Sequence, residues 1–149
     1  MSGPFKGVRV LELTSTVSGP FAGMMLADQG AEVIKIEPPG IGDLARFMGT
    51  IKDGMGAMFS TLNRNKKCIC LDFKNEEDLS VLMQLVSTAD VLIENYRPGI
   101  VKKLGIDYET LKEIKPDLIY CSISGYGQTG PYKEKKVYDP LIQGTVGIP

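Results

Sequence analysis

The stretch that decides the fold is Val8-Arg9-Val10-Leu11-Glu12-Leu13, which is followed by Ser18-Gly19-Pro20 and by an apolar segment from Phe21 to Asp28. The first run is rich in β-branched and apolar residues, as strands are. Ser18-Gly19-Pro20 is a helix-entry signal, and Gly30 is placed to act as the C-cap of the helix. The pattern predicts a strand, a turn and a helix in that order.

The same alternation continues along the chain. We expect further strands at residues 31–37, 68–73, 90–95 and 118–124, and helices at 57–63, 75–86 and 107–115. The clearest helix has Asn75 as its N-cap and acidic residues in its first turn. Short apolar strands that alternate with amphipathic helices predict a mainly parallel, doubly wound α/β sheet, with ligands at the carboxyl ends of the strands.

The composition excludes several classes of protein. With 149 residues, 43% hydrophobic and 23% charged, the chain has the makeup of one ordinary soluble globular domain. A net charge of -1 gives no long-range attraction for nucleic acid or for acidic membranes. The apolar runs are far shorter than the roughly 18 to 20 residues that cross a bilayer, and no signal or transit peptide is recognisable. We expect no nucleic-acid partner, no membrane partner and a cytoplasmic location.

The chain has no histidine and three cysteines, Cys68, Cys70 and Cys121. The lack of histidine excludes Ser-His-Asp and Cys-His catalysis within this chain and removes the commonest metal ligand, so we expect no metal site. Three cysteines cannot all pair, and we interpret them as reduced thiols in the core.

Three polar segments follow predicted strands, where such sheets bind ligands. Thr14-Ser15-Thr16-Val17-Ser18-Gly19-Pro20 offers hydroxyls and helix N-terminal amides to an anionic group, although simple capping also explains it. In Asn95-Tyr96-Arg97-Pro98-Gly99 the arginine suits a phosphate and the tyrosine an adenine ring, unless the segment is a surface turn. Gly125-Tyr126-Gly127-Gln128-Thr129-Gly130 matches a dinucleotide fingerprint, but Pro131 and the charged run 133–136 replace the helix that this fingerprint requires, which disfavours a nicotinamide or flavin site.

Five blocks of the sequence, taken in order, resemble the family III CoA-transferases and their relatives, the α-methylacyl-CoA racemases. The blocks are residues 7–13 with 18–20, 30–37 with Gly42-Asp43 and Arg46, 63–67, 89–99 with Leu104-Gly105, and 122–128 with Tyr138-Asp139. The resemblance implies that residues 1–149 are the N-terminal, CoA-binding, Rossmann-like portion of a longer two-domain chain that forms an interlocked homodimer. It also implies acyl-CoA and a small carboxylic acid as substrates, with no tightly bound cofactor.

The resemblance further implies which residues contact CoA. They lie in segments that follow the predicted strands, and their basic members would face the phosphates: Val17, Ser18, Leu71, Lys74, Asn95, Tyr96, Arg97, Lys103, Lys136 and Tyr138. Lysine clusters are otherwise typical of solvated faces, which is how we interpret the neighbouring Lys102, Lys133 and Lys135.

The chemistry that the resemblance implies is covalent catalysis by a carboxylate. In these transferases an aspartate attacks the acyl-CoA thioester, which gives a mixed anhydride and then an aspartyl-CoA thioester. That aspartate belongs to a later Gly-Asp motif, expected beyond Pro149, so we expect no catalytic residue in this chain and no activity of the 149-residue chain alone. Asp139 lies in the earlier Tyr-Asp block, where we expect a positioning or structural role.

Two other functions compete with the transferase. Racemases resemble this chain but carry a catalytic histidine where it has Tyr138, and a tyrosine, whose pKa is ordinarily about 10, is a poor base at neutral pH. The second competitor is a non-catalytic binding or assembly module. The sequence favours the transferase over both.

Overall fold

The computed structural model describes residues 3–148, and its centre is a five-stranded sheet in the order β5-β2-β1-β6-β7. All neighbouring strands are parallel. They are β1 (Arg9–Leu13), β2 (Glu32–Glu37), β5 (Lys66–Cys70), β6 (Val91–Glu94) and β7 (Ile119–Ser122). The chain runs outward from β1 through β2 to β5, then returns to build β6 and β7 on the other side. β1 and β6 therefore flank the point where the strand order reverses, which is where open α/β sheets bind ligands.

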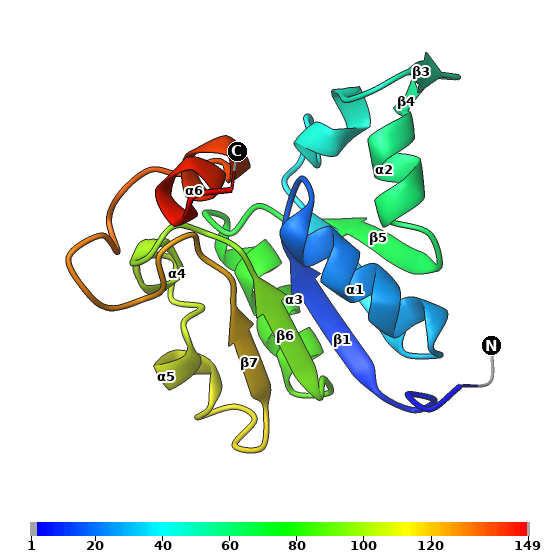
Figure 1. The fold of residues 1–149 in the computed structure, drawn as a ribbon. Helices are drawn as coiled ribbons and strands as arrows, with labels where there is room; N and C mark the ends of the chain where they lie inside the picture. Colours follow the sequence, from blue (N-terminus) through cyan, green and yellow to red (C-terminus); the bar gives the residue numbers. More distant parts are fainter. Residues whose placement is uncertain (1–2, 149) are drawn as a thin grey trace.

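Helices cover both faces of the sheet (Figure 1). α1 (Ser18–Asp28) lies on one face and α3 (Glu76–Val86) on the other, which confirms the predicted doubly wound architecture. α4 (Ile100–Lys103) and α5 (Tyr108–Leu111) precede β7, and α6 (Asp139–Val146) lies near the carboxyl ends of β6 and β7. Between β2 and β5 the chain forms the 3-10 helix η1 (Leu44–Phe47), the hairpin β3 (Ile51–Lys52) and β4 (Met55–Gly56), and α2 (Ala57–Leu62).

One apolar cluster packs against each face of the sheet. On the α1 face its buried members are Val10, Ala27, Ala31, Val33 and Ile93. On the α3 face the cluster is larger and includes Leu11, Leu13, Ile34, Ile36, Leu82, Val86, Leu92, Ile106 and Leu111. Successive strand residues point to opposite faces, and the central strands place apolar residues on both, as is usual in a parallel sheet covered on both sides.

Local signals in the sequence set the helix ends. The side-chain oxygen of Asn75 accepts hydrogen bonds from the backbone N–H groups of Glu77 (2.8 Å) and Asp78 (3.2 Å), which confirms it as the N-cap of α3. α1 ends at Asp28 with Gln29 as its C-cap, and Gly30 follows with φ 101°. Gly30 therefore lies one residue beyond the predicted position, in the left-handed conformation that favours glycine after a helix.

Several predicted boundaries are wrong. β5 spans 66–70 rather than 68–73, because the chain turns into α3 after Cys70 and the N–H of Asp72 donates to the Asp78 side chain (2.8 Å). The helix predicted at 107–115 covers only α5, since tight turns carry the chain to Pro116. The sequence did not predict α4, and α6 is the element that it left undefined after Pro140.

The prediction that the cysteines lie in the core is also wrong. Cys68, Cys70 and Cys121 are free thiols, but all three are exposed. They belong to β5 and β7, which are the edge strands of the sheet and are less completely covered than β1, β2 and β6.

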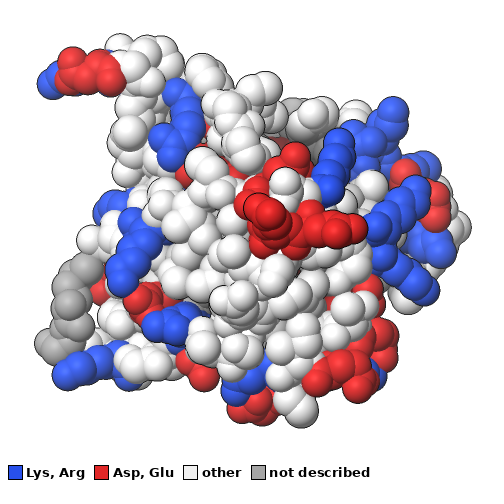
Figure 2. Space-filling model, turned by 180° about the vertical axis from the view of Figure 1, so that it is seen from behind, with Lys and Arg blue, Asp and Glu red and all other residues white. Residues whose placement is uncertain are grey.

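Most of the charged side chains lie on the surface. On the face seen in Figure 2, Lys and Arg side chains form several separate groups with acidic side chains between them. Within residues 3–148 no helix has the length and apolar character needed to cross a membrane.

Candidate functional site

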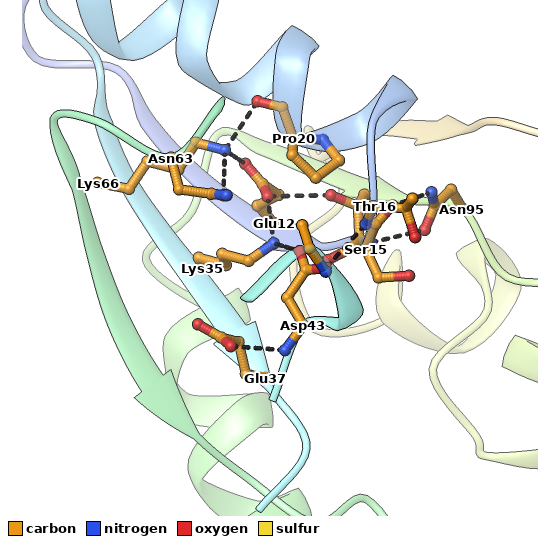
Figure 3. Close-up of polar contacts among 12 residues, drawn as sticks. Glu12, Ser15, Thr16, Pro20, Lys35, Glu37, Asp43, Asn63, Lys66 and Asn95 are labelled. Atoms are coloured by element: carbon orange, nitrogen blue, oxygen red, sulfur yellow. Dashed lines mark hydrogen bonds and ion pairs between the residues drawn. The ribbon is translucent and has the colours of Figure 1, made fainter. Parts of the chain in front are cut away.

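Two of the predicted ligand-binding segments meet where the strand order reverses, at the carboxyl ends of β1 and β6. Asn95, the first residue after β6, accepts a hydrogen bond from the backbone N–H of Ser15 (3.0 Å) and donates to the carbonyl oxygen of the same residue (2.9 Å). Its side-chain nitrogen also donates to the hydroxyl of Ser18 (3.4 Å). Residues 14–18, which we call the β1 turn, are thereby fixed against the segment that follows β6 (Figure 3).

The β1 turn contains an unusual backbone conformation. Thr16 has φ 71°, in the left-handed region, which costs a β-branched residue about 1–2 kcal/mol. Its N–H donates a hydrogen bond to Asp43 Oδ1 (2.9 Å), and the same oxygen accepts from the N–H of Ala45 (2.9 Å) as the N-cap of η1. Asp43 therefore links the loop after β2 to the strained residue of the turn after β1.

Behind the β1 turn lies a cluster of charged side chains, Glu12, Lys35, Asp43 and Lys66, which we call the buried ion network. Lys35 Nζ lies 3.0 Å from Glu12 Oε1 and 2.8 Å from Asp43 Oδ2, and Lys66 Nζ lies 2.7 Å from Glu12 Oε2. All four side chains are 0% exposed. With two cations and two anions the network is neutral as a whole, as burial of charges requires.

The ion pairs complete the contacts of the buried carboxylates. Within residues 3–148, Glu12 Oε2 and Asp43 Oδ2 accept no hydrogen bond of good geometry, so the neighbouring ammonium groups compensate for their burial. Removing either ammonium group would leave a carboxylate oxygen buried without a partner, which is far more costly than losing a surface pair.

The buried ion network also binds the backbone on both sides of the β1 turn. Lys35 Nζ donates to the carbonyl oxygen of Thr14 (2.8 Å), and the Thr14 hydroxyl donates to Glu12 (3.0 Å). Lys66 Nζ donates to the carbonyl oxygen of Pro20 (2.8 Å), in the first turn of α1. The turn is therefore held at its start, at Thr16 and just beyond its end.

The electrostatic surroundings keep Asp43 ionised. Burial acts to raise the pKa of its carboxyl, but the Lys35 ammonium and the hydrogen bonds from the N–H groups of Ala45 and Thr16 outweigh burial and hold that pKa below its usual range. Burial lowers the pKa of the Lys66 ammonium, against the attraction of Glu12.

A second ion pair fixes the other end of the loop that carries Asp43. Arg46 donates two hydrogen bonds to Glu37 (2.8 and 2.7 Å), and the backbone N–H of Asp43 donates to the same carboxylate (2.8 Å). Burial acts to raise the pKa of Glu37, but these hydrogen bonds prevail and lower it. The Arg46 guanidinium also lies 3.7 Å from the ring centre of Phe59, which is a cation–π contact.

Glu94, on the β6 side of the switch point, is a buried carboxylate with different partners from those of Asp43. It ends β6 and accepts a hydrogen bond from the backbone N–H of Tyr96 (2.7 Å). Burial raises the pKa of its carboxyl, although hydrogen bonds from Ser122 and Tyr96 oppose the shift. The pKa of the Tyr96 phenol is raised as well, first by burial and then by the charge of Glu94.

The predicted CoA contacts all follow the carboxyl ends of strands, but their accessibility differs. Those exposed to solvent are Val17, Ser18, Lys74, Arg97, Lys103, Lys136 and Tyr138. Leu71 is only 8% exposed and belongs to the core cluster on the α3 face, and the half-buried ring of Tyr96 packs on the same cluster. Asn95 is half-buried, and its side-chain amide is bonded to two residues of the β1 turn, Ser15 and Ser18.

Two further predictions concern the C-terminal segment. Asp139 is the first residue of α6, is exposed, and accepts a hydrogen bond from the side chain of Gln143. After β7 the segment 125–130 is not followed directly by a helix, because α6 begins only at Asp139. A dinucleotide site of this type requires a helix that begins directly after the glycines, and this segment is not followed by one. Within residues 3–148, no three His, Cys, Asp or Glu side chains are grouped to hold a metal ion.

Sequence reasoning missed the buried ion network. A signal for it exists, because Glu12 and Lys35 each lie between two apolar residues of a strand run, and their charges are opposite. The register of β1 and β2 places these two residues side by side. Charged residues of opposite sign inside neighbouring buried strands predict such a pair.

Comparison with known proteins relates the whole chain to one family. The family model described as CoA-transferase family III matches residues 5–149. The acetyl-CoA:oxalate CoA-transferase of Acetobacter aceti is 47% identical over 146 residues, which are 98% of this chain and 38% of that protein. The succinyl-CoA:glutarate CoA-transferase of Homo sapiens is 43% identical over 146 residues, 97% of this chain and 33% of that protein.

Solved structures show the same relationship. The crystal structure of a CAIB/BAIF family protein from Brucella suis matches with a TM-score of 0.94 and 46% identity, over 99% of this chain and 40% of that one. The crystal structure of Rv3272 from Mycobacterium tuberculosis matches with a TM-score of 0.91 and 37% identity, over 99% of this chain and 41% of that one. The chain thus spans well under half the length of these relatives.

Proposed function

The chain belongs to CoA-transferase family III, and on this premise we propose that the native protein transfers CoA from an acyl-CoA to a small carboxylic acid. The observation that carries the proposal is the match of the family model to residues 5–149. Relatives are named as transferases acting on oxalate, glutarate and succinate, which are short dicarboxylic acids. We therefore place the acceptor of this protein in the class of short dicarboxylic acids.

Residues 1–149 would supply the CoA-binding part of that protein. The geometry supports this role because the β1 turn and the segment that begins with Asn95 lie together at the switch point of the sheet, bonded through Ser15 and Ser18. Open α/β sheets bind ligands at this place. The turn presents exposed Val17 and Ser18, and Arg97 is exposed two residues after Asn95.

Four exposed basic residues that come after strands in the chain would bind the phosphates of CoA. Arg97, Lys74, Lys103 and Lys136 are all exposed and each follows the carboxyl end of a strand. A charge-assisted hydrogen bond to a phosphate is stronger than a neutral one, and the exposed ring of Tyr138 offers a surface for the adenine. Leu71, Asn95 and Tyr96 would line the same site mainly through their backbone or their already fixed side chains.

The proposed reaction proceeds through a carboxylate supplied by the rest of the native protein. An aspartate oxygen attacks the thioester carbonyl and the C–S bond breaks. This releases the CoA thiolate and forms a mixed anhydride between the acyl group and the aspartate. The thiolate then attacks the aspartyl carbonyl, which releases the donor acid and forms an aspartyl-CoA thioester. The acceptor carboxylate repeats both steps in reverse and leaves as acyl-CoA, so the aspartate is restored and no redox partner is needed.

The first test measures the reaction itself with the native protein. Acetyl-CoA, succinyl-CoA and formyl-CoA serve as donors, and oxalate, glutarate and succinate as acceptors, with the acyl-CoA products separated by chromatography. We expect CoA exchange for at least one pair. No exchange with any pair, combined with exchange of the α-proton of a 2-methylacyl-CoA with solvent, would identify a racemase instead; neither activity would favour a binding or assembly module.

The second test measures what Lys103 contributes to CoA binding. Lys103→Ala should raise the KM for acyl-CoA about tenfold, because a hydrogen bond to a charged phosphate is lost. Lys102→Ala is the matched control, since Lys102 is the neighbouring exposed lysine of α4 and its removal changes the net charge equally. Equal effects of the two substitutions would mean that only general charge attraction, and no contact with Lys103, assists binding.

We also propose that two copies of the native protein form an interlocked homodimer and that it acts in the cytoplasm. Exposed apolar side chains between β2 and α2 support an association surface, namely Ile41, Leu44, Phe47 and Ile51. Sedimentation of the native protein tests the dimer, and a monomer at every concentration would contradict it.

A further inference from the structure

We propose that Asp43 is a positioning residue for CoA: it fixes Thr16 in its left-handed conformation so that Val17 and Ser18 face the ligand. The inference rests on the proposed function and extends it to a residue that lies outside the predicted contact set. Asp43 belongs to one of the sequence blocks that resemble the family.

The first step is the conformation of the β1 turn. Thr16 holds φ 71°, which non-glycine residues adopt only when their surroundings impose it. Val17, the next residue, is the N-cap of α1, and it lacks a side-chain capping bond. The direction of the chain through Val17 and Ser18 therefore depends on what holds Thr16.

The second step is that Asp43, which accepts the hydrogen bond from Thr16, is itself held rigidly. Asp43 is 1% exposed, and its two oxygens are both used: Oδ1 accepts from Thr16 and Ala45, and Oδ2 lies 2.8 Å from Lys35 Nζ. Its own backbone N–H is bonded to Glu37. Apart from Thr16, Asp43 is thus fixed at three points, and such an acceptor can impose a strained conformation on its partner, whereas a mobile surface carboxylate cannot.

The third step separates this bond from the other bonds of the turn. Lys35 binds Thr14 and Asn95 binds Ser15, so both residues before Thr16 have partners of their own. Among residues 3–148, Asp43 is the partner found for the N–H of Thr16. Loss of Asp43 should therefore release Thr16 while the start of the turn stays in place.

The test compares two substitutions of Asp43 that both remove its charge but differ in whether an acceptor oxygen remains. Asp43→Asn and Asp43→Ala both leave Lys35 beside a position without negative charge, but only asparagine keeps an oxygen that can accept from Thr16 and Ala45. In the native protein we expect Asp43→Asn to weaken CoA binding about threefold and Asp43→Ala at least about tenfold. Binding is measured by isothermal titration with CoA, with folding of each variant checked by circular dichroism.

A second readout needs no ligand. Hydrogen exchange of the Thr16 amide should be faster in Asp43→Ala than in Asp43→Asn, and slowest in the unsubstituted protein. Glu94→Gln is the matched control, because it makes the same change from carboxylate to amide in an equally buried residue, whose side chain accepts its hydrogen bond from Tyr96 and not from the β1 turn. It should leave exchange at Thr16 unchanged.

The outcomes distinguish the two proposals. If the unsubstituted protein fails to bind CoA, the proposed function fails, and the exchange measurement alone decides whether Asp43 holds Thr16. If it binds CoA and the two substitutions at Asp43 weaken binding equally, or if Thr16 exchanges alike in all variants, Asp43 has only a structural role and the inference is wrong. Should Asp43→Ala not fold, Asp43→Ser replaces it, because the serine hydroxyl ends one bond short of the position that reaches Thr16.

Discussion

Asp43 and Glu94 are two carboxylates at the same edge of the sheet, equally buried at 1% exposure, and their pKa values are shifted in opposite directions. Asp43, on the β2 side, lies against Lys35 and accepts hydrogen bonds from two backbone N–H groups. Glu94, on the β6 side, accepts a hydrogen bond from Tyr96 but makes none of the ion pairs found among residues 3–148. Burial alone therefore does not decide the charge of a carboxylate; its partners do.

The largest effect should come from removing the cation that two carboxylates share. Lys35→Met leaves Asp43 buried without its ion-pair partner, and breaking such a buried pair costs about 3–5 kcal/mol of unfolding free energy. Urea denaturation of the native protein at pH 7 measures the loss. The double variant Lys35→Met/Asp43→Asn should recover more than half of it, because Lys66 still neutralises Glu12. A double variant as unstable as Lys35→Met would mean that the buried charge of Asp43 is not the cause of the lost unfolding free energy.

A somewhat smaller effect should follow from crowding the buried ion network. A Cβ atom at Gly23 of α1 would lie 1.9 Å from Glu12 Oε2, and that carboxylate is held by Lys66 and cannot move freely. We expect Gly23→Ala to lower the unfolding free energy by about 2–3 kcal/mol. Gly144→Ala in α6 is the control, since nothing lies within 4 Å of its added Cβ and alanine favours a helix. Equal stability of the two variants would contradict the close packing of α1 on Glu12.

The pH dependence of stability should distinguish Glu94 from Asp43. Because the folded-state pKa of Glu94 is raised, its contribution to stability is full below the unfolded pKa of about 4.3 and is lost as the pH rises through the folded value. Glu94→Gln should therefore be more stable than the unsubstituted protein at pH 8, by about 1 kcal/mol, and this gain should vanish toward pH 4.

Asp43→Asn should show the opposite trend in the same pH series. The folded-state pKa of Asp43 is lowered, so its contribution is full above the unfolded pKa of about 3.9 and is lost as the pH falls through the folded value. Thermal melts between pH 3 and pH 8 measure both variants. If the stability of Glu94→Gln and that of Asp43→Asn, each relative to the unsubstituted protein, change with pH in the same direction, the two pKa values are not shifted in opposite directions.

The smallest effect should come from an ion pair that water already screens. Lys67 Nζ lies 2.6 Å from Glu32 Oε1, but the Lys67 side chain is 71% exposed. Lys67→Gln should change the unfolding free energy by less than about 0.5 kcal/mol, although the charges are as close as those in the buried ion network. A loss comparable to that of Lys35→Met would mean that distance, rather than burial, sets the strength of these pairs.

Much of the fold was predictable because its signals are local. The apolar runs that became β1, β2 and β6 and the capping residue Asn75 act over a few residues, and the structure confirms them. Element ends were less predictable: the start of β5 at Lys66 and Lys67 carries no apolar pattern, since it belongs to an edge strand. The four-residue helices α4 and α5 are too short to give a clear periodic signal.

The candidate site was predictable only in part, because its geometry depends on distant residues. The sequence placed Ser18 and Asn95 after strands, and the structure brings them into contact. It did not reveal that Lys35 is buried, since that depends on Glu12, 23 residues earlier in the chain, and on the fold of the loop that carries Asp43. Nor did it reveal that Leu71 belongs to the core, which follows from the turn that ends β5.

The bonds that fix the β1 turn also set when it can form during synthesis. Residues 14–18 leave the ribosome before Asp43 and Asn95, so the bond of Thr16 must wait for Asp43, 27 residues later, and that of Ser15 for Asn95, 80 residues later. Contacts of such long sequence separation form late in folding. The earliest translated part of the binding edge is therefore among the last to reach its native conformation, and a nascent chain that stalls before Asn95 has no ordered site to offer a ligand.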